Sequence, residues 1–86
     1  MIFEVYAIKD RFGAWQSPMI FRDEEEAASQ LKKFFTEQKV EKSSVRGSKL
    51  YRIGSFNILA SGNPFSGDDV HLVFDILDKF EDVIIE

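Results

Sequence analysis

The chain has 86 residues and a net charge of −4, and 44% of its residues are hydrophobic, including nine phenylalanines. A chain of this length forms at most one domain, residues 1–86, and buries only about 60–65% of the surface that its unfolded form exposes. The apolar content excludes a disordered chain, and the lack of cysteine excludes disulfides and thiolate metal sites.

No secretory signal is expected, because MIFEVYAIKD has no basic region before its apolar residues and no small-residue cleavage site. The longest uncharged stretch, residues 53–67, holds three glycines and a proline, so we expect no membrane span. Together with the absence of cysteine, these features fit a cytoplasmic protein.

The first elements expected along the chain form a β-hairpin. Residues 2–9 are mainly β-branched and aromatic, which predicts a strand. Residues 10–14 (DRFGA) predict a turn centred on Gly13, and residues 15–21 predict the return strand. Pro18 cannot donate a ladder hydrogen bond, so the return strand should lie at a sheet edge or contain a bulge.

Asp23 predicts the start of a helix, because it is a good N-cap residue and Glu26 follows three residues later. Apolar side chains then fall at helical spacing on one face. These residues are Ala27, Ala28, Leu31, Phe34 and Phe35. We assign both Phe34 and Phe35 to the core and expect the helix to end near Gln38.

A mobile basic loop is expected over residues 41–48 (EKSSVRGS), and a third strand over Lys49 to Ala60. The apolar face of this strand changes sides near Gly54, which predicts a bulge at Gly54–Ser55. The sequence SGNP at 61–64 predicts a turn.

The C-terminal third has two readings. Ser66 and Asp69 match a capping box, and apolar residues follow at three- and four-residue spacing, which favours a helix over 66–80. The segment HLVFDIL is also rich in strand formers, so a strand remains the alternative. A short extended end is expected at 83–85.

These elements predict an α+β fold, in which a small antiparallel sheet (hairpin, helix, third strand) is followed by a C-terminal helix. The first helix should cover one sheet face. The other face should then carry Ile2, Tyr6 and Ile8, with Tyr51, and be covered by the C-terminal helix or by another subunit. A small domain with a spare apolar face often completes its core by pairing, so we expect a homo-oligomer and favour a dimer.

Charge is distributed unevenly along the chain. Residues 32–52 carry seven basic and two acidic residues, whereas residues 68–86 carry one basic and seven acidic residues. The acidic C-terminal segment could fold over the basic loop when no nucleic acid is bound, recruit a partner protein or simply favour solubility.

No catalytic motif is present, and the single histidine, His71, lies among apolar residues, so we expect no enzymatic activity, no cofactor and no metal. The acidic residues lack the spacing of a calcium loop. Basic residues beside aromatic residues instead favour contact with nucleic acid, because phosphates attract cations and bases stack on aromatic rings. The candidate nucleic-acid-binding residues are Lys42, Arg46, Lys49, Tyr51, Arg52 and Trp15.

Three stretches carry a family resemblance: MIFEVYAIKDRFGAWQSPMIF, DEEEAASQLKKFF and KLYRIGSFN. They resemble the small nonstructural protein of gokushovirus-type microviruses, which are single-stranded-DNA bacteriophages. The late signature LY-x-[IL]-G-x-[FY] corresponds to Leu50, Tyr51, Ile53, Gly54 and Phe56. The resemblance covers roughly residues 1–58. Beyond it, Asn57 and ILASGNP replace the family's acidic D-x-x-T-G turn, and the acidic segment from Asp68 onward has no match.

The resemblance implies a non-enzymatic phage protein of the host cytoplasm that binds DNA while genome replication changes from duplex to single-strand synthesis. This implication leads to two hypotheses. In the first, the chain binds single-stranded DNA as a replication accessory. In the second, it is a protein–protein adaptor whose apolar sheet face and acidic C-terminus recruit a replication or host protein.

Overall fold

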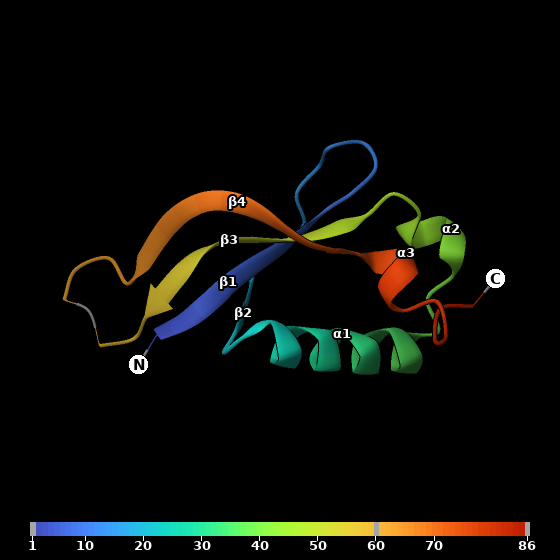
Figure 1. Ribbon diagram of the computed structural model, residues 1–86, viewed down its shortest axis with the longest axis horizontal. Helices are drawn as coiled ribbons and strands as arrows, with labels where there is room; N and C mark the ends of the chain where they lie inside the picture. The colour runs from blue at the N-terminus through green and yellow to red at the C-terminus, as the bar shows by residue number, and fades with distance from the viewer. Residues whose placement is uncertain (1, 60, 86) are drawn as a thin grey trace.

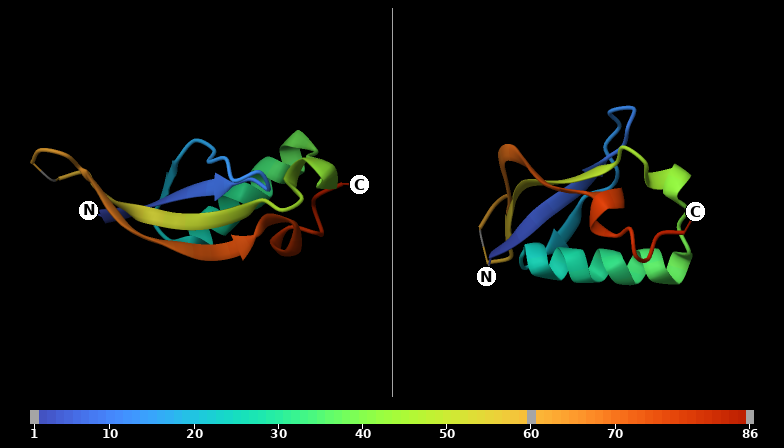
Figure 2. Two further views of the ribbon diagram at one scale, coloured as in Figure 1. Left: turned by 90° about the horizontal axis from the view of Figure 1, so that it is seen from above. Right: turned by 45° about the vertical axis from the view of Figure 1, so that its right-hand side comes forward.

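The structure, a computed structural model, describes residues 2–59 and 61–85. Four antiparallel strands form one sheet in the order β2-β1-β3-β4. The helices lie along one face and at one end of this sheet (Figures 1 and 2). The predicted α+β fold is confirmed, and the described part of the chain is elongated, with extents of 46 × 24 × 16 Å.

The N-terminal hairpin follows the sequence prediction closely. Strand β1 spans Ile2–Lys9, and the Asp10 carboxylate accepts hydrogen bonds from the backbone N–H groups of Phe12 and Ala14, which closes the turn. The return strand β2 is shorter than predicted, at Met19–Phe21, with one isolated bridge from Trp15 to Lys9 before it. Pro18 lies between this bridge and β2. Because proline has no backbone N–H to donate to a neighbouring strand, the return strand was expected at a sheet edge, and β2 is an edge strand.

Helix α1 spans Glu24–Gln38, and its predicted start is confirmed, because the Asp23 side chain accepts a hydrogen bond from the N–H of Glu26. The helix ends at Lys39, whose backbone is left-handed. Phe35 is buried, but Phe34 is 51% exposed, so its assignment to the core was wrong. Successive helical residues point about 100° apart, and only one of two adjacent phenylalanines can face the sheet directly.

Residues 41–48 are not a simple loop, since Lys42–Val45 form one helical turn, α2. The C-terminal segment holds this region by its backbone. The N–H of Lys42 donates to the carbonyl of Ile85, and the N–H of Ile76 donates to the carbonyl of Ser48. Both contacts join residues far apart in the sequence, so local composition could not reveal them.

Strand β3 spans Lys49–Asn57 and contains a bulge one residue before the predicted position. Val5 lies opposite Gly54 and Tyr6 opposite Arg52, which leaves Ile53 as the extra residue. Of the predicted third strand, Ala60 lies outside the described residues.

The helix predicted over 66–80 was wrong for most of its length. Residues Phe65–Asp75 form the fourth strand, β4, paired with β3, and only Ile76–Lys79 form the short C-terminal helix α3. The alternative strand reading of HLVFDIL is therefore the observed one for residues 71–75, whereas Ile76 and Leu77 are helical. Two register shifts in the β3–β4 ladder disturb strict alternation, so the apolar spacing of β4 imitates that of a helix.

The core lies between the sheet, α1 and the C-terminal segment. Tyr6 and Leu50 of the sheet pack with Phe35 of α1 and with Ile76 and Phe80. Tyr6 and Ile8 thus face the helix, whereas they were expected on the opposite face. Among residues 2–59 and 61–85, every helix is too short or too polar to cross a membrane.

Candidate nucleic-acid interface

The candidate site lies on the sheet face that the helices leave uncovered, which we call the open face (Figure 2). Residues directly opposite each other on neighbouring strands project from the same face. Tyr51 lies between Ala7 of β1 and Leu72 of β4, and Lys9 lies opposite both Lys49 and Trp15. The odd-numbered residues of β1 point away from the helix side, where Tyr6 and Ile8 pack. These residues therefore belong to the open face.

An aromatic pair stands at one end of the open face. The Trp15 and Tyr51 rings are 5.4 Å apart in an edge-to-face arrangement. Trp15 is 46% exposed, and the Lys9 ammonium lies 5.3 Å from the centre of its ring. This geometry leaves much of the indole accessible while Tyr51 and Lys9 hold its orientation.

A second aromatic row crosses the open face near its other end. Phe56 of β3 lies between Phe3 of β1 and Phe65 of β4. Phe65 is partly exposed, and the other two are half-buried. The open face therefore presents aromatic rings at both ends. Trp15 and Tyr51 lie at one end, and the row on β1, β3 and β4 lies at the other.

Two lysines supply positive charge beside the Trp15–Tyr51 pair. Lys9 and Lys49 are directly opposed across β1 and β3. The Lys49 ammonium lies 3.9 Å from a carboxylate oxygen of Asp75, with both side chains partly exposed. An exposed pair at this distance contributes at most about 1 kcal/mol, so it leaves Lys49 able to contact a phosphate.

The structure brings together only three of the six predicted residues. Trp15, Lys49 and Tyr51 share the open face. Lys42 lies in α2 and Arg46 caps it, at the end of the sheet. Lys9 was missed by the sequence reasoning, although it shares the two-residue alternation of Phe3, Val5 and Ala7 and so could have been assigned to this face.

Arg52 is directed to the opposite face, because it lies opposite Tyr6. Its guanidinium pairs with the Glu4 carboxylate and, at 3.1 Å, with the Asp68 carboxylate. The hydrogen bond to Glu4 is the main cause that raises the pKa of Arg52. Arg52 thus joins β1, β3 and β4 next to the bulge, and its charge is already compensated.

The basic stretch 32–52 does not form one continuous basic surface. Three of its residues pair with the acidic C-terminal segment: Lys32 with Asp82 at 3.4 Å, Lys49 with Asp75, and Arg52 with Asp68. These three pairs lie on α1 and β3, outside residues 41–48, over which the acidic segment was expected to fold.

Burial also affects one ionisable group next to the site. The Tyr6 side chain is enclosed by the core, and burial, followed by the nearby Glu4 carboxylate, raises its pKa to about 12. Tyr6 therefore remains neutral across the physiological range and acts as a core residue. No cluster of histidine and carboxylate side chains able to hold a metal occurs within residues 2–59 and 61–85.

Comparison with known proteins gave no match: no family model, no curated protein and no solved structure matches this chain.

Proposed function

We propose that the chain is a non-enzymatic protein that binds single-stranded DNA on its open face. The observation that carries this proposal is the Trp15–Tyr51 pair, in which Trp15 is exposed, flanked by Lys9 and Lys49 on a sheet face without helices. Every base has a flat π-face, so an accessible aromatic ring can stack with a base of any sequence.

Binding uses the two kinds of side chain differently. Unpaired bases stack on Trp15 and, farther along the face, on the Phe56 and Phe65 row. Lys9 and Lys49 contact the phosphates between them. The open face offers two lysines and the chain is acidic overall, so stacking contributes more to the binding free energy than charge does. The salt dependence should therefore be shallow. For two phosphate contacts, the slope of log K against the logarithm of the salt concentration is about −1.4.

The biological role in this proposal comes from the resemblance to gokushovirus nonstructural proteins. The chain acts in the cytoplasm of a bacterial host as an accessory to genome replication, at the stage when single strands are made. A dimer, if formed, doubles the number of stacking surfaces on one strand.

Fluorescence anisotropy with a labelled, unstructured single strand tests the proposal. We expect binding at low salt with micromolar protein. Trp15→Ala should weaken this binding about 5- to 150-fold, since one base–aromatic stack is worth about 1–3 kcal/mol. Lys9→Ala combined with Lys49→Ala should weaken it and flatten the salt dependence.

Phe34→Ala is the matched control, because Phe34 is an equally exposed aromatic residue on α1, away from the open face. Its affinity should equal that of the unsubstituted chain. Absence of any anisotropy change at low salt would refute the proposal, as would an equal loss of affinity in the Phe34 and Trp15 variants.

A second candidate function, the protein–protein adaptor, is favoured by the apolar residues that the open face exposes. Ile20 is 48% exposed and Leu72 is 57% exposed. A replication or host protein, or a second copy of the chain, could cover them. Light scattering separates the candidates: a stable complex that Leu72→Asp disrupts, without any response to DNA, supports the adaptor.

A further inference from the structure

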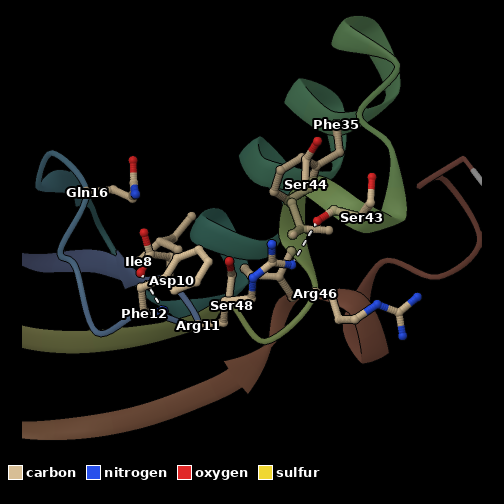
Figure 3. Close-up of a pocket in the computed structure, with 12 residues that line it drawn as sticks. Ile8, Asp10, Arg11, Phe12, Gln16, Phe35, Ser43, Ser44, Arg46 and Ser48 are labelled. Carbon is tan, nitrogen blue, oxygen red and sulfur yellow. Dashed lines mark hydrogen bonds between the residues drawn. The ribbon is translucent and has the colours of Figure 1, made fainter.

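A cleft of about 340 Å³ opens at the end of the sheet, between the β1–β2 turn and the segment that runs from α2 to β3 (Figure 3). Its lining includes apolar side chains, of which Ile8 is partly buried and Phe35 and Ile76 are almost completely buried. Ile8 and Phe35 belong to the helix side of the sheet. The cleft is therefore separate from the open face, and a ligand in it would bind independently of DNA on that face.

The rim of the cleft is polar and carries two guanidinium groups. Arg11 comes from the turn, and Arg46 comes from the opposite side together with the hydroxyl-bearing Ser43 and Ser44. The one carboxylate in the lining, Asp10, already accepts two backbone hydrogen bonds of 2.9 Å inside the turn. The lining of the cleft therefore carries more positive than negative charge, and the cleft is partly shielded from water.

The two arginines are held in different ways. The Arg11 guanidinium stacks on the Phe12 ring, 4.8 Å from its centre, and donates one hydrogen bond of 3.3 Å to the Ser43 carbonyl. Its other N–H groups have no partner among the described residues. Arg46 is exposed and extends outward from the rim (Figure 3), so its side chain can turn towards a ligand without disturbing the core.

The backbone fixes the width of the cleft. Gly47 has a positive φ of 80°, and a Cβ added there would lie 2.6 Å from the Cβ of Arg11. The turn and the α2–β3 connection can approach this closely only because residue 47 is glycine. The carbonyl of Ser48 accepts a hydrogen bond from the N–H of Ile76, and this bond anchors the α2–β3 connection to the core.

We propose that this cleft binds a nucleoside monophosphate, either free or as the terminal nucleotide of a strand. The phosphate lies between Arg11 and Arg46, where planar guanidinium groups match its oxygen atoms, and the Ser43 and Ser44 hydroxyls donate to it. The base lies against Ile8 and the exposed ring of Phe12. The volume is at the lower end of the range for ligand pockets, about 300–1,000 Å³, which suits one nucleotide.

Amide NMR titration with adenosine 5′-monophosphate tests the site. We expect shifts at Arg11, Ser43 and Ser44 at lower ligand concentrations than any shifts at Trp15 or Tyr51. Arg46→Gln should weaken binding about 10- to 100-fold, as expected for loss of a charge-assisted hydrogen bond. Lys33→Gln, at an exposed position on α1 outside the lining, is the matched control and should change nothing.

Three further probes complete the test. Adenosine should bind much more weakly than its monophosphate, and inorganic phosphate should also bind more weakly. A short oligonucleotide with a 5′-phosphate that shifts the same amides better than its unphosphorylated form identifies the strand end as a source, whereas a response to the mononucleotide alone identifies the free ligand. The proposal is overturned if the monophosphate shifts none of these amides at millimolar concentration. It is also overturned if Arg46→Gln binds as well as the Lys33 control.

Discussion

Replacing Gly54 by alanine tests the close approach of β3 and β4 beside the bulge. The added Cβ would lie 2.4 Å from the carbonyl oxygen of Ser66 and 3.2 Å from the Cα of Gly67, both backbone atoms that cannot rotate away. Ordinary contacts between such atoms are about 3.5 Å, so the strands must separate by about 1 Å. Overpacking costs about 1–3 kcal/mol, and one weakened ladder hydrogen bond adds about 1 kcal/mol.

We therefore expect Gly54→Ala to lower the free energy of unfolding by about 2–4 kcal/mol, measured by urea denaturation with far-ultraviolet circular dichroism. In a domain of this size, Tm should fall by about 10–25 °C. This is a large part of the total stability, which for small domains is about 5–15 kcal/mol.

Gly67→Ala is the matched control, because Gly67 lies opposite Gly54 on β4. A Cβ at this position meets only the Phe65 ring, at 3.6 and 3.9 Å, which is ordinary van der Waals contact. Its stability should change by less than about 1 kcal/mol. Equal stability of the two variants would show that β3 and β4 do not approach each other as described, and the reasoning would fail.

Three further predictions concern the core, the helix cap and pH. Phe35→Ala should cost about 3–5 kcal/mol and Phe34→Ala less than about 1 kcal/mol in urea denaturation, since only Phe35 is buried; similar losses would contradict the assigned helix face. Asp23→Ala should cost about 1 kcal/mol, and Asp23→Asn much less, because asparagine can still accept the hydrogen bond from Glu26. Burial raises the pKa of Tyr6 from 10.0 to about 12, so between these values the unfolded chain loses its Tyr6 proton while the folded chain keeps it. The contribution of Tyr6 to the free energy of unfolding should therefore be fully present below pH 10 and decrease as the pH rises towards about 12. Tyr6→Phe should remove this pH dependence. If the variant keeps the same pH dependence, another ionisable group causes it.

Local signals predicted the elements whose structure depends on neighbours in the sequence. Asp23 and Glu26 define the start of α1 because a cap involves residues three positions apart. The alternation of β1 and the Asp10 turn are equally local, and both are confirmed. The bulge was placed within one residue, because the change of apolar face near Gly54 is visible in the sequence itself.

The candidate site was only partly predictable. Trp15 and Tyr51 were named as binding residues from composition, but nothing in the sequence indicated that their rings meet across two strands. Arg52 was chosen for its charge, whereas its partners Glu4 and Asp68 are 48 and 16 positions away and only the sheet brings them to it. Counting charges along the sequence therefore predicted a larger basic surface than the structure has.

By itself, the sequence determined an α+β domain with an amphipathic first helix, a hairpin and a bulged central strand, because propensity, capping and periodicity act over a few residues. Only the tertiary structure decided that residues Phe65–Asp75 form a strand. Their spacing suits a helix and their composition suits a strand, so local preferences nearly cancel. The long hydrogen-bonded ladder with β3 stabilises only the extended form. The same ladder fixes which residues face the helices, and so decides that Trp15, Tyr51, Lys9 and Lys49 share the open face.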